Sequence, residues 1–254
     1  MRSPIPIADC HGHIGVHPDF PAYKTSPEEM IRVMDHLNIE MLAVTSALAC
    51  YNDCPRGNAD VDTVLRKFPE RFRAYVTVNA TPKGQALEQL QRYAHFHQPP
   101  LIKMHPDLQK YAVNGLDYRP AWDYANQTRA IVLVHTWDSD PNCGPLLLEG
   151  IAREFPRARI LIGHAGVTWH GYMQALEVAR KAPNTYLDIA GSQSHRTILE
   201  HCVAEVGPER ILFGSDMPYL EASVALGRVL SARIPDNAKC AILRQNFLRL
   251  LEEA

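Results

Sequence analysis

The sequence predicts an α/β fold of the (β/α)₈ barrel class, formed as a single domain over residues 1–254. Short apolar segments alternate with amphipathic segments eight times along the chain, which is typical of parallel strands joined by right-handed helical crossovers. The length of 254 residues is close to the ~250 residues of such a barrel. An open, doubly wound parallel sheet is the alternative that the same alternation allows.

The expected strands are near-continuous apolar runs, as strands buried on both faces require. The first begins in the run of Ile5, Ile7 and Ala8 and leads to two histidines. The other seven cover residues 40–46, 72–80, 100–106, 130–137, 158–166, 184–191 and 210–218.

The expected helices carry apolar residues at spacings of three and four. In the first of them, Ser26 is a suitable N-cap, Pro27 suits the first helical position, and Glu28 and Glu29 favour the positive end of the helix dipole. The helices are expected at residues 26–37, 58–68, 85–97, 119–127, 145–154, 172–182, 197–206, 221–232 and 237–252.

The charge pattern and the apolar runs exclude two classes of partner. The formal net charge is −2 and the sequence has no basic stripe, so nucleic acid is not an expected partner. No apolar run approaches the ~20 residues of a membrane span, and MRSPIPIADC enters a strand pattern without room for a signal peptide. We therefore expect a cytoplasmic protein with a small-molecule substrate. A homo-oligomer is compatible with the sequence.

The six cysteines are expected to be reduced, as in other cytoplasmic proteins. Cys50 and Cys54 in CYNDC have a spacing that could bind zinc, but no second Cys/His pair follows at the distance found in zinc fingers. We expect a loop with two free thiols. The glycine-rich motifs of dinucleotide and P-loop sites are absent from the sequence.

The stretch ADCHGHIG, residues 8–15, places two histidines one residue apart at the end of an apolar run. Side chains two apart in a strand point to the same face, so His11 and His13 are expected to converge, with Asp9 in the same phase one step deeper. Gly12 would let the backbone or a bound group approach between them. Neutral imidazoles are common metal ligands, although a solvated strand end would look the same.

Polar residues follow most of the expected strands, at the ends where barrel enzymes carry their working residues. A single histidine at such an end is more often structural than a ligand. Five histidines and a carboxylate that converge on one rim predict a metal site. The residues at these ends are His11, His13, Thr45, Ser46, Asn79, Lys103, His105, His135, His164 and Asp216.

Several of these strand ends carry motifs of a known family. D-C-H-G-H, I-K-M-H-P, L-V-H-T, I-G-H-A-G and L-F-G-S-D-M-P together resemble the amidohydrolase superfamily. More narrowly they resemble its amidohydrolase-2 branch, which includes aminocarboxymuconate-semialdehyde decarboxylase-like enzymes. The resemblance extends from Asp9 to about Asn246.

The resemblance implies a divalent metal, first of all Zn²⁺, as one ion or two. It implies His11, His13 and His135 as ligands, and Asp216 in contact with both the metal and the reacting water. His164 would be a ligand of a second metal or a hydrogen-bond donor to substrate.

Lys103 is the ambiguous position in this resemblance. In binuclear relatives a lysine on the fourth strand is carbamylated and bridges two metals, whereas in mononuclear relatives the residue there binds substrate or has little role. We also expect His105, two residues further along the same strand, to bind substrate.

The expected chemistry is hydrolysis. A water bound to Zn²⁺ has its pKa lowered to about 7, Asp216 can take its proton, and His164 can stabilise charge on a carbonyl oxygen. The main expectation is therefore a hydrolase of a small amide, ester or lactone. The first alternative is a non-oxidative decarboxylase of a small carboxylic acid. The second, a non-catalytic metal-binding barrel, is disfavoured because structural zinc sites are normally closed and rich in cysteine.

Overall fold

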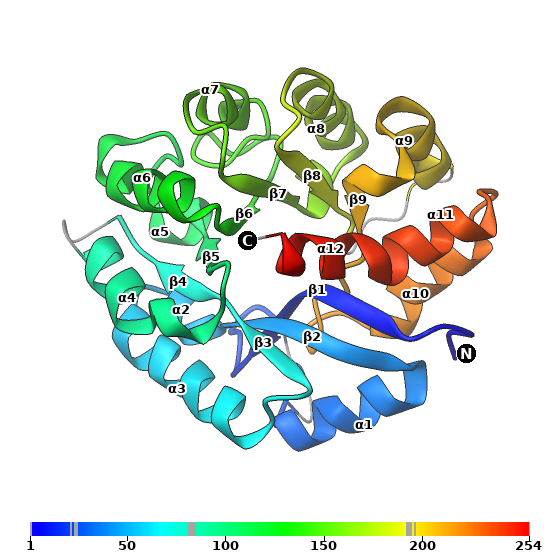
Figure 1. Ribbon diagram of the computed structural model, residues 1–254, viewed down its shortest axis with the longest axis horizontal. Helices are drawn as coiled ribbons and strands as arrows, with labels where there is room; N and C mark the ends of the chain where they lie inside the picture. The colour runs from blue at the N-terminus through cyan, green and yellow to red at the C-terminus, as the bar shows by residue number, and fades with distance from the viewer. Residues whose placement is uncertain are drawn as a thin grey trace.

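The structure is a computed structural model that describes residues 2–20, 22, 25–80, 85–191, 195 and 197–253. Its parallel strands form a ring, and helices surround that ring on the outside (Figure 1). The prediction of a (β/α)₈ barrel is confirmed. Residues 1 and 254, the ends of the expected domain, lie outside the described residues.

The eight expected strands are all present, although the third is interrupted at Tyr75. In the described part of the chain the strand segments are β1 (Ile7–Ile14), β2 (Ile39–Ser46), β3 (Phe72–Ala74), β4 (Val76–Val78), β5 (Leu101–Met104), β6 (Ile131–His135), β7 (Arg159–Gly163), β8 (Thr185–Asp188) and β9 (Ile211–Leu212).

Backbone hydrogen bonds close the ring at two places where the regular strand pairing stops. Strands pair in the orders β1-β2-β3 and β4-β5-β6-β7-β8-β9, all parallel. The Tyr75 N–H donates to the Val44 carbonyl at 2.9 Å, which joins β2 to the interrupted third strand. The His13 N–H donates to the Met217 carbonyl at 2.8 Å, which joins β1 to the segment after β9.

The helices occupy the expected places between the strands. Ser26 caps the first one as expected, because its Oγ accepts the Glu29 N–H at 3.3 Å. The helices are α1 (Pro27–Leu37), α2 (Ala47–Cys50), α3 (Cys54–Lys67), α4 (Gln85–Tyr93), α5 (Pro106–Gln109), α6 (Arg119–Thr128), α7 (Leu147–Glu154), α8 (Trp169–Lys181), α9 (Ile198–Val206), α10 (Ala222–Ser231), α11 (Asp236–Cys240) and α12 (Asn246–Glu252). Helices α11 and α12 are joined by a π-helical turn at Ala241–Gln245.

Helix α3 begins four residues before the expected position 58. Asp53 caps it by accepting the Arg56 N–H at 3.3 Å, and Pro55 lies in its first turn. The expected loop at CYNDC is therefore shorter than the motif and covers residues 51–53, while the expected free thiols are confirmed. Cys50 ends α2 and Cys54 begins α3, and both thiols are buried and free.

Between Asp9 and Gly12, strand β1 carries one extra residue relative to β2, which offsets an extra residue on β2 between the partners of Ile7 and Ala8. Asp9 pairs with Leu42 and Gly12 pairs with Val44, so three steps along β1 match two steps along β2. This is a β-bulge, and it shifts the alternation of side chains by one residue. The expectation that Asp9 shares a face with the histidines is therefore wrong, because the bulge lies between them.

Packing against β2 explains why glycine stands between the two histidines. A Cβ atom on Gly12 would lie 2.7 Å from Leu42 Cδ1, so the missing side chain makes room for a neighbour on β2. The expected close approach of backbone is present, because Gly12 forms a β-bridge with Met217. Approach of a bound group at Gly12 stays a prediction.

The barrel interior is apolar towards the amino ends of the strands. Helix α12, drawn in red, crosses the centre of the ring at that end (Figure 1). Arg159 at the start of β7 fastens it, because its guanidinium donates to the carbonyls of Leu250 at 2.5 Å and Glu253 at 2.8 Å. The interior cluster consists of Ala8, Cys10, Met41, Ala43, Tyr75, Leu101, Ile131, Leu133, Leu161, Tyr186, Leu212, Phe247 and Leu250.

Among the described residues, every helix is too short or too polar to cross a membrane.

The packing of helix α12 against the interior cluster gives a prediction about the stability of the fold. Phe247 of α12 is fully buried in the interior cluster, so Phe247→Ala should lower the free energy of unfolding by about 3–5 kcal/mol. Denaturant unfolding followed by circular dichroism measures this loss. Val224→Ala on α10, 60% exposed, is the control and should change it by no more than about 0.5 kcal/mol. A loss below about 1 kcal/mol for Phe247→Ala would contradict the packing of Phe247 in the interior cluster.

Candidate metal centre

Three donor side chains meet where β1 and the segment after β9 come together. His13 Nε2 lies 2.9 Å from Asp216 Oδ1, and His11 Nε2 lies 3.6 Å from the same oxygen. The three donor atoms lie within 4.8 Å of one another. Ligands at 2.0–2.2 Å from a tetrahedral ion are about 3–3.5 Å apart, so this group can close on one cation with small movements.

The backbone places Asp216 at this point. Its φ of 61° is left-handed, so the chain leaves the extended path at this residue. Strand β9 itself already ends at Leu212, before the expected residue 218. The Asp216 N–H donates to the His11 carbonyl at 2.8 Å. Asp9 Oδ1 reinforces the junction, since it accepts the N–H groups of His11 at 3.0 Å and Ser215 at 3.1 Å. Burial raises the pKa of the Asp9 carboxyl to about 7.

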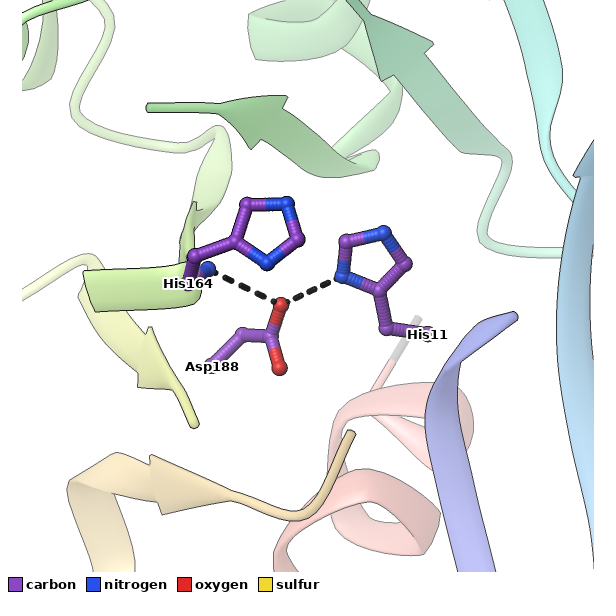
Figure 2. Close-up of side chains that lie close together, drawn as sticks. All are labelled: His11, His164 and Asp188. Carbon is purple, nitrogen blue, oxygen red and sulfur yellow. Dashed lines mark hydrogen bonds and ion pairs between the residues drawn. The ribbon is translucent and has the colours of Figure 1, made fainter. Parts of the chain in front are cut away.

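A second group of donors shares His11 with the first. Asp188 Oδ2 lies 2.6 Å from His11 Nδ1 and accepts the backbone N–H of His164 at 3.3 Å (Figure 2). His11, His164 and Asp188 also place one donor atom each within 4.8 Å of the others.

Asp188 is the member of the site that the sequence reasoning missed. It ends β8 two residues after Tyr186, whose side chain belongs to the barrel interior. The signal that could have found it is this two-residue spacing, which puts the carboxylate on the interior face of an expected strand.

Two further histidines, His105 and His135, lie beside His164 at the ends of β5, β6 and β7. His164 Nε2 lies 3.1 Å from His135 Nδ1, and the rings of His135 and His105 stack with centroids 4.0 Å apart. His135 is thus joined to His164 rather than to the group of His11, His13 and Asp216. Its role as a metal ligand stays a prediction, as does substrate binding by His105.

Lys103 points into the barrel, since its neighbours Ile102 and Met104 belong to the outer core. Its Nζ is fully buried and lies 3.2 Å from His11 Nε2. Lys103 is therefore close to the donors but beneath the cavity described below. Carbamylation, metal bridging and substrate binding by Lys103 stay predictions.

Burial and hydrogen bonding set the protonation states of the group. Burial lowers the pKa of His11 and His13, and also that of His135 and His164. Burial alone would raise the pKa of Asp216, but the hydrogen bond from His13 and the neighbouring imidazoles hold it well below its ordinary value. Neutral imidazoles beside an ionised carboxylate are the states that metal binding requires.

Two imidazole nitrogens close to the donors have no hydrogen-bonding partner in the described part of the chain. Among the described residues, His13 Nδ1 and His164 Nδ1 are buried without a hydrogen-bonding partner. Buried polar atoms without partners are rare in native proteins, so each of these nitrogens is a position at which a bound group can supply the partner. They are not the nitrogens that face Asp216, which are Nε2 of His11 and His13. Imidazole and carboxylate donors suit Zn²⁺, Mn²⁺ and Fe²⁺.

A cavity of about 300 Å³ opens above the group. Aromatic and imidazole rings supply much of its wall. The lining residues among those described are His13, His17, Asp19, Phe20, Ala47, Cys50, His105, Asp107, Leu108, His135, Trp137, His164, Val167, Gly191, Asp216, Tyr219 and Leu220.

Two comparisons of sequence bear on this site. The family model described as amidohydrolase matches residues 8–252. An uncharacterised protein of Sinorhizobium fredii is 25% identical over 175 residues, a match that covers 59% of this chain and 57% of the relative's own length.

Solved structures share the fold over the whole chain. A 2,6-dihydroxybenzoate decarboxylase complexed with 2,6-dihydroxybenzoate is 19% identical, with a TM-score of 0.78 and 99% of each chain covered. A dihydroxybenzoic acid decarboxylase from Polaromonas sp. JS666, with bound manganese and the inhibitor 2-nitroresorcinol, is 16% identical, with a TM-score of 0.77 and 99% and 97% of the two chains covered. At these identities the likeness shows the fold.

The donor group gives a prediction about metal content. We expect the purified protein to carry a divalent cation, and His13→Ala to lose most of it, because the variant removes one of three converging donors. Elemental analysis measures the content and identifies the metal, including the expected Zn²⁺. His170→Ala, on the exposed surface of α8, is the control. Wild-type metal content in His13→Ala would overturn the assignment of His13 as a ligand.

Proposed function

From the premise that this chain belongs to the amidohydrolase family, we propose that it is a divalent-metal-dependent enzyme that removes CO₂ non-oxidatively from a small hydroxylated aromatic or dienoic acid. Two solved structures with the same fold are, by their descriptions, decarboxylases of dihydroxybenzoic acids. Because of this likeness we place decarboxylation before hydrolysis, whereas the sequence alone led us to expect a hydrolase first and a decarboxylase as the alternative.

The observation that carries the proposal is a ring-walled cavity directly above the donor group. The rings of Phe20 and Tyr219 stack with centroids 5.8 Å apart and an interplanar angle of 19°, and His17 packs against both. On another part of the wall, His105 and His135 stack at 4.0 Å. Flat walls of this kind favour a planar substrate, and about 300 Å³ is at the small end of ligand pockets.

The cation is expected to be held by His11, His13 and Asp216, with His135 and His164 as further candidates. When bound, it supplies positive charge to a substrate carboxylate and to an adjacent hydroxyl oxygen. The rings of the wall exclude water and orient the plane of the substrate above the donors, so the reacting carbon is held in one position.

Asp216 is the group to which we assign the proton transfer. It is ionised in the free site, so it can accept the proton of a substrate hydroxyl and then deliver that proton to the ring carbon that carries the carboxylate. The bond between that carbon and the carboxylate then breaks, CO₂ leaves, and the electron pair returns to the ring. His164 faces the same cavity and is assigned to hydrogen bonding with the substrate.

Hydrolysis of a small amide, ester or lactone is the second candidate. It is favoured by the same ionised Asp216, which can accept a proton from a water molecule whose pKa a bound cation has lowered. The two reactions differ in their product, because only decarboxylation releases CO₂.

A substrate panel tests the proposal. Hydroxybenzoic and dienoic acids in one arm, and esters, amides and lactones of similar size in the other, are incubated with the metal-loaded protein. We expect CO₂ release from at least one acid and its loss on chelation, with the circular dichroism spectrum unchanged. Turnover confined to the second arm would replace decarboxylation by hydrolysis. No turnover in either arm would overturn the proposal and favour a non-catalytic barrel.

Asp216 gives a sharper prediction. Asp216→Asn keeps the shape of the side chain but removes most of its basicity. We expect this variant to fold, to retain part of its metal and to lose activity roughly a hundredfold or more. Asp60→Asn, an exposed position on α3, is the matched control. Turnover of Asp216→Asn within a few-fold of wild type, with metal bound, would show that another residue transfers the proton.

A further inference from the structure

We propose that Asp188 is a positioning residue, which fixes the ring of His11 so that Nε2 faces the donors His13 and Asp216. The proposal rests on the metal binding assigned above, but it holds whichever reaction the site performs. It treats the second donor group, formed by His11, His164 and Asp188, as a hydrogen-bonding device and not as a second metal site.

The contacts of Asp188 support this reading. Its Oδ2 lies 2.6 Å from His11 Nδ1 and accepts the His164 N–H at 3.3 Å, and its Oδ1 accepts the Ala190 N–H at 2.8 Å. Figure 2 shows the carboxylate lying between the two histidines. Both oxygens of this fully buried carboxylate therefore have donors supplied by the chain. Oδ2, the oxygen that faces both histidines, already has two such donors, so a metal ion bound through Oδ2 would have to displace one of them.

The two sides of the His11 ring select the same tautomer. A carboxylate accepts hydrogen bonds, so Asp188 calls for a proton on Nδ1. On the opposite side the amino group of Lys103 lies 3.2 Å from Nε2 and can donate to it. With Nδ1 protonated, the single lone pair of Nε2 faces the amino group of Lys103, with Asp216 Oδ1 3.6 Å away. A cation held by Nε2 would take the place of the Lys103 contact. A carboxylate behind a ligating histidine is a recurring way to orient the ring and raise its basicity.

Gly214 makes room for this pair. A Cβ atom there would lie 2.2 Å from Asp188 Oδ1 and 3.0 Å from His11 Cβ, closer than packed atoms allow. Gly214→Ala therefore displaces the pair without removing either side chain. Gly150 on α7 has no atom within 4 Å of the same position, so Gly150→Ala is a matched control.

The first experiment measures metal affinity without reference to activity. Metal-stripped protein is titrated with Zn²⁺ in competition with a chromophoric chelator. We expect Asp188→Asn and Gly214→Ala to weaken binding about 10–100-fold, with Asp60→Asn and Gly150→Ala unchanged. An affinity of folded Asp188→Asn within about twofold of wild type would overturn the proposal.

The second experiment needs no variant of Asp188, so it stands if Asp188→Asn fails to fold. Nitrogen-15 NMR of labelled histidines reports the tautomer of each ring in the metal-free wild-type protein, and His11→Gln identifies the signals of His11. We expect the proton on Nδ1, and a proton on Nε2 would overturn the proposal. Normal Zn²⁺ affinity with no CO₂ release would count against the proposed reaction alone.

Discussion

The junction between the first and last strands is the constraint on which the rest of the site depends. Asp9 Oδ1 accepts the N–H groups of His11 and Ser215, two residues 204 positions apart (215 − 11). The Asp216 N–H donates to the His11 carbonyl at 2.8 Å. Because these bonds set the register between the strands, they also set the distance between Asp216 and the imidazole of His13. Closure of the barrel and assembly of the donor group therefore depend on the same hydrogen bonds.

This arrangement separates the groups that stabilise the barrel from those that perform its chemistry. At one end, α12 plugs the interior with Phe247 and Leu250. At the other end, Lys103, Asp188 and His11 are fully buried polar groups, and burying such groups is unfavourable unless each finds a partner. They find most of these partners in one another, and the apolar end supplies stability that can offset what remains. In barrels of this class, the carboxyl ends of the strands carry the residues needed for activity, and the amino ends carry the residues needed for stability.

Much of the fold could be predicted from sequence because it depends on patterns repeated along the chain, such as the apolar runs and the cap at Ser26. The two-residue spacing of His11 and His13 correctly placed both rings at one site, but for an incomplete reason. The bulge in β1 inserts a residue that no alternation rule anticipates, so Asp9 was assigned to the wrong face. Asp188 was missed because its importance comes from contacts with residues far away in the sequence, and a lone aspartate in a buried strand carries no motif.

The placement of His164 shows why such contacts matter more than local preference. His164, Ala165 and Val167 all have positive φ angles, of 59°, 45° and 69°, and left-handed residues with side chains cost about 1–2 kcal/mol each. No local propensity favours this path. Asp188 opposes the cost by accepting the His164 N–H, so the same carboxylate that orients the His11 ring also holds the backbone of the second histidine. Strain at a functional site persists only where surrounding contacts over-determine the backbone. Here Asp188 holds the N–H of His164, while the Thr136 hydroxyl donates to the Gly163 carbonyl at 2.6 Å and accepts the Gly166 N–H at 3.0 Å.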